Sequence, residues 1–246
     1  MQHSTSQVVM FTVGMTSIVA LLLAGMFTFL KPVHDTNEAL YNKKQILGAL
    51  NAPLEITADN LTDEEVGQYF ENVEQLVVNS KGELIEGVKA EDVNMEKEEK
   101  KAVEDRQFPV FIMNNKGEKY YILTVRGNGL WDKIWGWVAL ESDLNTVAGA
   151  AFGHKAETPG LGAEIKDNAG WKAQFVGEQI YDKSGEYVSV DIVKGGADPM
   201  NKNGVDAISG ATVTCVGAAE MIHNGIALYL PYLNSISDSD TKTGQK

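Results

Sequence analysis

Hydrophobic and polar residues follow several distinct patterns along the chain, and the first of them predicts a membrane anchor. Val8 to Leu30 is mostly apolar and contains no charged residue. As a helix, this stretch spans roughly 34 Å, which is enough to cross a hydrocarbon core of about 30 Å. A cleaved signal peptide fits less well, because no basic residues precede the stretch and it exceeds the roughly 7–15 apolar residues of a signal peptide. We therefore predict a single transmembrane helix over 8–30.

Helical spacing of apolar residues continues beyond the anchor. Residues 34–50 are expected to form a linker helix, and residues 59–80 carry apolar side chains at near-helical intervals. Thr62 with Glu65 three residues later is typical of a helix start. The charged run 91–106 is expected to be a solvated loop or an exposed helix.

From residue 108 onward the pattern changes to that of β-strands. Residues 108–115 and 119–129, joined by Asn115-Lys116-Gly117, are expected to form a hairpin. Within 130–143, residues 134–139 alternate as in a strand, further strands are expected over 147–154 and 187–195, and a short helix is expected over 171–176. Strands that come in runs, instead of alternating with helices, favour an α+β fold with a mainly antiparallel sheet and helices packed on it.

These patterns divide the chain into five parts. We expect an N-terminal tail over 1–7, the transmembrane helix over 8–30, a linker with a helix over 31–58, an α+β domain over 59–233, and a disordered tail over 234–246.

Composition narrows the possible functions. The chain has 246 residues, of which 43% are apolar, so it can build a sizeable core. A net charge of −13 argues against nucleic acid as a partner, because phosphate backbones require clustered lysine and arginine. The single cysteine, Cys215, excludes an internal disulfide, and the four histidines have no metal-ligand spacing. We predict no metal site.

The lysines around the anchor bear on its orientation. Lys31, Lys43 and Lys44 follow the apolar stretch, and no lysine or arginine precedes it. Taken alone, the positive-inside rule would leave the large domain in the cytoplasm.

A small-residue turn near the C-terminus is the first candidate for chemistry. Ser209-Gly210-Ala211-Thr212 follows Asp206 and precedes an apolar stretch that is expected to be helical. Unpaired N–H groups at a helix start favour a phosphate group. The turn has neither the lysine of a Walker loop nor the glycine of a hydrolase elbow. On physics alone, a helix capped by Ser209 remains the more common explanation.

Two other glycine-rich turns could contact a planar ring. One is Pro159-Gly160-Leu161-Gly162, which lies between the carboxylates Glu157 and Glu164, and the other is Arg126 to Trp131. Singly, each is more often a plain turn. The histidines at 154 and 223 are expected to be structural.

The N-terminal anchor, GNGLW, ETPGLG and SGATVT occur in an order that resembles the C subunit of the Na+-translocating NADH:quinone reductase, over essentially the whole chain. The resemblance implies covalent FMN, which a flavin transferase attaches from FAD to the motif threonine. Thr212 is then the attachment residue, and Thr214 is the runner-up or touches the phosphate. The implied recognition sequence is Asp206, Ser209, Gly210 and Ala211, and the implied neighbours of the isoalloxazine are Thr158, Leu161, Leu130 and Trp131. Gly160 and Gly129 are also implied to belong to the cofactor site.

The resemblance also implies a function. The chain would be an electron-transfer subunit that relays electrons toward quinone, with the B, D, E and F subunits as partners and the bilayer as support. It would lie in the bacterial inner membrane, with the N-terminus in the cytoplasm and the FMN domain in the periplasm, against the lysine count. Electron transfer by a flavin needs no general acid or base, so no catalytic residue is assigned.

Other functions remain open at this point. The G subunit of the Rnf complex carries the same flavinylation motif. A membrane-anchored module that binds a phosphate-bearing ligand reversibly is a second alternative. An assembly subunit in which the threonine turn only caps a helix is a third.

Overall fold

The computed structural model describes residues 4–243, with side chains described through Ser237. The chain divides into two compact units, Met1–Asn42 and Lys43–Lys246. Each unit is described below by itself.

The first unit is most of helix α1 (Thr5–Gly48), whose apolar side chains are exposed along its N-terminal part. Three threonine hydroxyls of this part bond back to carbonyls of the preceding turn, such as Thr12 to Val8 at 2.9 Å. Internal satisfaction of polar groups is what a helix in lipid requires. Among the described helices, α1 alone is by itself long and apolar enough to span a membrane.

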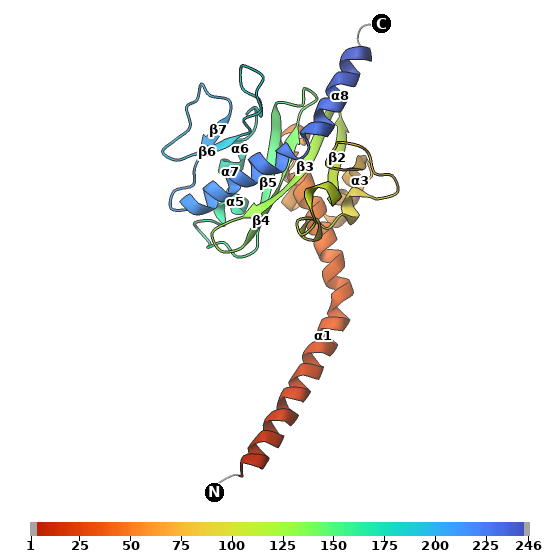
Figure 1. Cartoon of the computed structure of the whole chain (residues 1–246), viewed down its shortest axis with the longest axis vertical. Coiled ribbons are helices and arrows are strands. Elements are labelled where there is room, and N and C mark those ends of the chain that lie inside the picture. The colour runs from red at the N-terminus through yellow and green to blue at the C-terminus, as the bar shows by residue number, and fades with distance from the viewer. Residues whose placement is uncertain (1–3, 244–246) are drawn as a thin grey trace. The chain divides into compact units, whose positions relative to one another are not determined.

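The second unit is built on a five-stranded antiparallel sheet (Figure 1). Its strands are β1 (Val73–Val78), β2 (Phe108–Asn115), β3 (Glu118–Asn128), β4 (Lys133–Leu140) and β5 (Val147–His154), paired in chain order. The β2–β3 hairpin turns at Lys116 and Gly117, whose φ angles of 52° and 94° are those of a tight two-residue hairpin turn. Sequence and structure agree on this meander, so the predicted mainly antiparallel α+β fold is confirmed.

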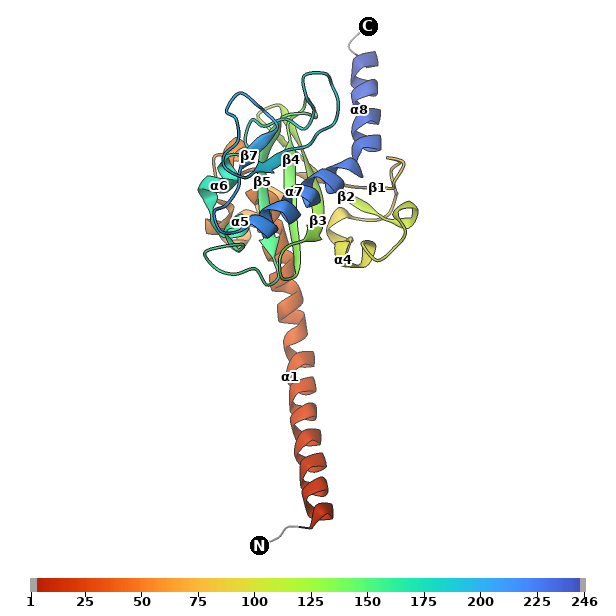
Figure 2. The same cartoon turned by 60° about the vertical axis from the view of Figure 1, so that its left-hand side comes forward.

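Both faces of the sheet are covered. Helix α7 (Thr212–Ala227) packs on one face, where Ala218 and Ile222 join the core formed by Val125, Ile134 and their neighbours (Figure 2). The other face bears Ile122 and Ala139, which are also fully buried. Successive residues along the strands therefore point to two faces that are both apolar and buried, in contrast to a sheet that has one face in solvent.

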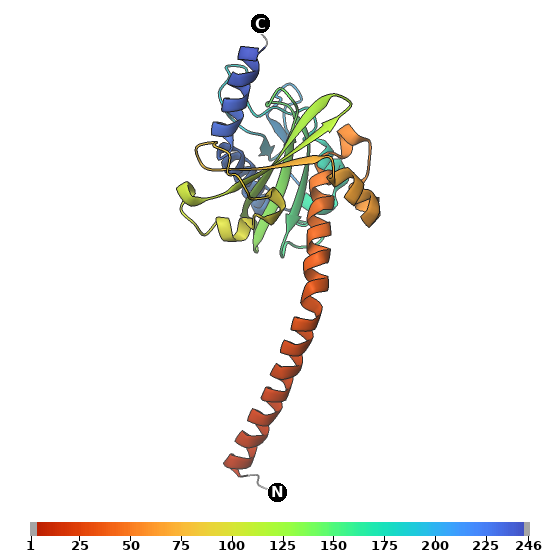
Figure 3. The ribbon, with the colours of Figure 1, turned by 90° about the vertical axis from the view of Figure 1, so that its right-hand side faces the viewer.

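The remaining elements are short. They are α2 (Asn51–Leu54), η1 (Ala58–Asn60), α3 (Asp63–Phe70), η2 (Ala90–Asp92), α4 (Met95–Glu98), η3 (Val103–Asp105), α5 (Glu164–Asp167), α6 (Ala169–Ala173), β6 (Asp191–Val193), β7 (Gly204–Asp206) and α8 (Leu230–Thr243). Helices α2 and α3, orange in Figure 3, lie beside the strands. Strands β6 and β7 form a separate parallel pair.

One predicted helix and one predicted strand are shorter in the structure than expected. The helix predicted within 59–80 begins at the Thr62–Glu65 capping box as expected, but it ends at Phe70. Strand β1 follows, because its β-branched residues pair with β2, and tertiary pairing overrides helical spacing. The strand predicted over 187–195 is confined to Asp191–Val193.

Two other segments were expected to lack packed structure. Of the tail expected over 234–246, residues 234–243 belong to helix α8, whose first turn includes the buried Tyr232 and Leu233, and residues 244–246 lie outside the described residues. In the charged run 91–106, Glu98 is buried and accepts hydrogen bonds from Lys101 and from the backbone N–H of Gln107, so this run is docked in part.

Candidate functional site

The three glycine-rich motifs meet at the N-terminal end of α7. Leu161 contacts Gly210 so closely that a Cβ at Gly210 would lie 2.8 Å from the leucine Cδ2. A Cβ at Gly217 would likewise collide with the carbonyl oxygen of Asn128, which places the GNGLW turn against α7. The fold therefore brings together segments that lie more than 80 residues apart in the chain, from Gly129 to Gly217.

Helix α7 begins with a bare N-terminus. Ala211 is its N-cap and provides no side-chain hydrogen bond, and Thr212 is the first helical residue. The alternative that Ser209 caps this helix is therefore wrong. Gly210 adopts φ = 79°, a left-handed conformation that glycine accepts without a steric penalty. The first N–H groups of a long helix that lacks a side-chain cap attract an anion.

The two threonines of SGATVT have opposite environments. Thr212 is exposed, whereas Thr214 is only 1% exposed. The Thr214 hydroxyl donates a hydrogen bond to Oε2 of Glu157 at 2.6 Å. The Thr212 hydroxyl is thus available to a reactant, and the Thr214 hydroxyl is already engaged inside the protein.

Glu157 links all three motifs. Its carboxyl group is buried, with the residue 4% exposed. Besides the Thr214 hydroxyl, it accepts the backbone N–H of Trp131 through Oε1 at 3.0 Å. Its own N–H donates to Nδ1 of His154 at 3.2 Å. We call Glu157, Thr214, the Trp131 backbone, Gly129 and Gly162 the Glu157 junction.

Around this junction lies an apolar surface. Leu130, Trp131 and Leu161 are 50%, 67% and 42% exposed, which is high for such large apolar side chains. The Trp131 indole N–H donates to Oγ1 of Thr158 at 3.2 Å, which orients the ring. We call Thr212, Leu130, the Trp131 side chain and Leu161 the exposed rim.

The loop that carries Leu130 and Trp131 is held at both ends. The Gly129 N–H donates to the carbonyl oxygen of Asp132 at 2.8 Å, which closes the turn. The Lys133 backbone N–H and then the Lys155 ammonium lower the pKa of the Asp132 carboxyl. Glu99 reaches from the charged run 91–106 and forms ion pairs with Arg126 and Lys133, one on each side of the turn.

The structure also shows the environment of the predicted recognition residues Asp206, Ser209 and Ala211. Asp206 is exposed at the end of β7, and its Oδ1 accepts the Ala197 N–H at 2.8 Å. The Trp171 indole N–H donates to the Asp206 carbonyl oxygen at 2.7 Å, which fixes the backbone ahead of the turn. Ser209 is exposed, and Ala211 is buried.

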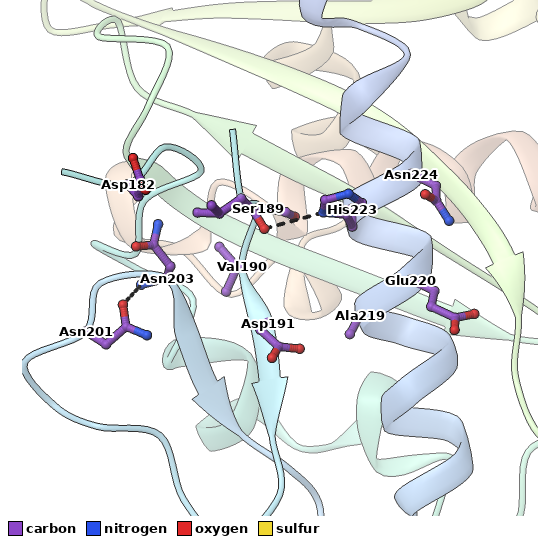
Figure 4. A pocket seen from close by; sticks show the side chains of 11 residues that line it. Asp182, Ser189, Val190, Asp191, Asn201, Asn203, Ala219, Glu220, His223 and Asn224 are labelled. Carbon is purple, nitrogen blue, oxygen red and sulfur yellow. Dashed lines mark hydrogen bonds between the residues drawn. The ribbon is translucent and has the colours of Figure 1, made fainter. Parts of the chain in front are cut away.

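A different recess, of about 500 Å³, lies farther along α7 (Figure 4). It is lined by the carboxylates Asp182, Asp191 and Glu220, by the amides Asn201, Asn203 and Asn224, and by His223, with no lysine or arginine. Clustered carboxylates disfavour a phosphate-bearing ligand. None of the predicted site residues lines this recess, so the site assignment stays at the start of α7.

Two contributors were not predicted as site residues. Glu157 was noted only as a carboxylate that flanks a turn, and Glu99 only as part of a charged run. A carboxylate next to the Pro159–Gly162 turn was a signal for Glu157, but its partners come from segments distant in sequence. Glu99 carried no local signal.

Comparison with known proteins agrees with this geometry. Residues 129–227 match the FMN-binding domain family, a range that includes ETPGLG, SGATVT and the last three residues of GNGLW. The chain is similar to the C subunit of the Na(+)-translocating NADH-quinone reductase of Pseudomonas aeruginosa, with 43% identity over 48% of this chain and 46% of that protein. The match thus spans less than half the length of this relative.

Longer matches extend over most of the chain. The Chlamydia muridarum protein of the same description is 34% identical over 81% of this chain and 72% of its own length. A crystal structure of the C subunit from Parabacteroides distasonis superposes with a TM-score of 0.72 at 35% identity, covering 83% of this chain and 96% of that one. These two matches extend over about four fifths of the chain.

Proposed function

The chain belongs to the family of C subunits of the Na+-translocating NADH-quinone reductases, and from this premise we propose that it carries FMN as an electron-transfer subunit of that membrane complex. The observation that carries the proposal is an exposed threonine at the uncapped start of α7, inside the segment that matches the FMN-binding domain. Such a subunit needs a bound flavin, and the start of α7 offers residues suited to hold one.

The residues at the site suit both ends of FMN. The uncapped N–H groups of α7 are suited to its phosphate, as is common at helix starts. Leu130, Trp131 and Leu161 offer an exposed apolar wall for the ring. Bound flavin supplies electron transfer in steps of one or two electrons. The role of these side chains is then to bind and orient the ring and to exclude water from one side of it.

We propose that the flavin is attached covalently through Thr212. The Thr212 oxygen would form a bond to the FMN phosphorus of FAD, the bond between the two phosphates would break, AMP would leave, and the hydroxyl proton would pass to solvent. The exposure of Thr212 supports this choice, whereas burial and the bond to Glu157 disfavour Thr214. Thr214 serves to hold the first turn of α7 in place.

The transferase would recognise the turn ahead of the threonine. Asp206, Ser209 and Gly210 are exposed and can be contacted by another protein, while the buried Ala211 keeps the turn close to the core. Thr158 and Gly160 lie in the exposed part of ETPGLG, next to Leu161, and Gly129 closes the turn that carries Leu130.

Placement in the cell follows from the same proposal. The apolar helix α1 would anchor the chain in the bacterial inner membrane, with the FMN domain in the periplasm and with the B, D, E and F subunits as partners. Protease added to intact spheroplasts should then digest the domain. Survival of the domain under conditions that digest a periplasmic control would place it in the cytoplasm instead.

The test of covalent attachment is mass spectrometry of the full chain, expressed with and without a flavin transferase. We expect one FMN on the peptide that contains Thr212, and a fluorescent band on a denaturing gel, only when the transferase is present. Thr212→Ala should lose the adduct completely, yet change the free energy of unfolding by less than about 0.5 kcal/mol because the residue is exposed.

Thr212→Ser is the matched control, since it keeps a hydroxyl at the same place. An adduct on Thr214, or flavin that washes away on denaturation, would contradict attachment at Thr212. The second result would favour a reversible binding module.

A further inference from the structure

We infer that Glu157 is a positioning residue that couples the start of α7 to the loop carrying Leu130 and Trp131. The inference rests on the proposed function, because it concerns how the flavin site is held together. The Glu157 carboxyl group does not itself need to touch the flavin. It acts through Thr214 and through the Trp131 backbone.

The first argument is the use of both carboxyl oxygens. Oε1 accepts the Trp131 backbone N–H at 3.0 Å, and Oε2 accepts the Thr214 hydroxyl at 2.6 Å. One buried group therefore connects the turn after β3 with the first turn of α7. Hydrogen bonds to a buried carboxyl group are costly to lose, because the group left behind is both desolvated and unpaired.

The second argument is the space around the group. A Cβ built at Gly162 would collide with Oε2 of Glu157 and would lie 2.6 Å from Oγ1 of Thr214. A Cβ at Gly129 would collide with Oε1 of Glu157. Two glycines of the motifs thus leave room for this carboxyl group, which gives a physical reason for glycine at both positions.

The third argument is the absence of another fixed partner. Across the part of the chain that the structure describes, no lysine, arginine or histidine forms an ion pair with Glu157. The carboxyl group is held by neutral donors from two motifs. The backbone N–H of Glu157 is held separately, by Nδ1 of His154. Its position therefore depends on the motifs that it joins.

The consequence is a fixed relation between the reactive threonine and the apolar wall. Thr212 lies two residues before Thr214 on the same helix, and the Trp131 side chain extends from the backbone that Glu157 holds. Loss of the carboxyl group would let these two parts of the site move independently. We expect slower flavin attachment, although all residues of the exposed rim, Thr212 included, would still be present.

The experiment compares Glu157→Leu with Glu157→Gln in the full chain in detergent. Glutamine keeps the shape, can accept the Trp131 N–H through its oxygen, and can donate to the Thr214 hydroxyl through its nitrogen. Without flavin, hydrogen exchange at the Trp131 amide should accelerate about tenfold in Glu157→Leu and stay within about threefold of wild type in Glu157→Gln. With limiting transferase, the FMN load should fall at least about threefold in Glu157→Leu and stay near the wild-type load in Glu157→Gln.

Thr214→Val provides a second route, because it removes one hydroxyl and leaves a chain of similar shape. Its FMN load should also fall, and Glu157→Leu with Thr214→Val should load no less than Glu157→Leu alone. Thr214→Ser, which keeps the hydroxyl, should load normally. If Glu157→Leu does not fold, the Thr214 pair and Glu157→Gln still decide the outcome.

Three results would overturn the inference. They are unchanged Trp131 exchange in a folded Glu157→Leu, a loss of loading in Glu157→Gln as large as in Glu157→Leu, or losses that add in the double variant. Failure of the proposed function is distinguishable, because the wild-type chain would then carry no FMN, while the exchange measurement would still report on Glu157.

Discussion

The Glu157 junction and the exposed rim are built from the same three motifs, yet they have opposite physical character. Glu157 and Thr214 are 4% and 1% exposed and bond to each other, whereas Trp131 and Leu130 present 67% and 50% of their surface to solvent. Within SGATVT, the exposed Thr212 belongs to the rim and the buried Thr214, two positions later, belongs to the junction. The junction stabilises the fold of the site, and the rim remains available to a ligand.

The two regions should respond differently to substitution. Changes in the junction should lower the free energy of unfolding, because buried groups lose partners or space. Changes in the rim should leave stability nearly unchanged and alter only what binds there. The following substitutions test this difference, from the largest expected effect to the smallest.

Gly162→Ala should have the largest effect on stability. Its Cβ would enter the space occupied by the carboxyl group of Glu157 and the hydroxyl of Thr214. We expect the free energy of unfolding to fall by about 1–3 kcal/mol, the usual cost of overpacking, as measured by urea unfolding of the full chain in detergent. Gly67→Ala is the matched control, since nothing lies within 4 Å of its Cβ in helix α3. It should stabilise the protein by about 0.5–1 kcal/mol. Equal effects of the two substitutions would mean that the junction is not tightly packed.

Glu99→Gln should have a smaller effect, on the loop that carries the rim. The Glu99 side chain is 30% exposed and pairs with Arg126 and Lys133, so we expect a loss of no more than about 1 kcal/mol, smaller still in high salt. Urea unfolding at two salt concentrations measures it. Glu96→Gln is the control, because the Glu96–Lys100 pair is far more exposed and joins two residues only four positions apart. A salt-independent loss, or the same loss in the control, would show that the ion pairs do not hold the loop.

Cys215 gives the mildest test, without a change in sequence. It lies on the buried side of α7, 2% exposed, and burial raises the pKa of its thiol. The unfolded thiol titrates near about 8.5, so folding favours the protonated form. Stability from this group is fully present below that pH and is lost as pH rises toward the higher pKa of the folded state. Alkylation by iodoacetamide at pH 8 should be slow in the folded protein and fast in urea. Equally fast labelling in both states would mean that the first turns of α7 open readily.

Local patterns predicted strands β2 to β5, the hairpin turn and the Thr62–Glu65 capping box, because these depend on neighbouring residues. Prediction was poorer where the partner is distant. Residues 73–78 have helical spacing with the segment before them, but pairing with β2 makes them a strand. The charged run 91–106 has the composition of a solvated loop, yet Glu99 is drawn to Arg126 and Lys133 of the sheet.

The same division applies to the site. The order of motifs in the sequence already indicated a flavin family and the threonine turn at 209–212, and the family comparison bears out the former. Spacing alone left Thr212 and Thr214 as alternatives, because both hydroxyls lie near the start of one helix. Their difference depends on which side of α7 faces the sheet.

By itself, the sequence determined an apolar anchor, a chain able to fold as an antiparallel sheet with helices, and three glycine-rich turns suited to a flavin. Only the tertiary structure decided which hydroxyl is buried, which carboxyl group joins the turns, and which apolar side chains stay exposed. The physical reason is that burial and hydrogen bonding depend on contacts between Gly129, Glu157 and Thr214, which chain folding brings together from distant positions.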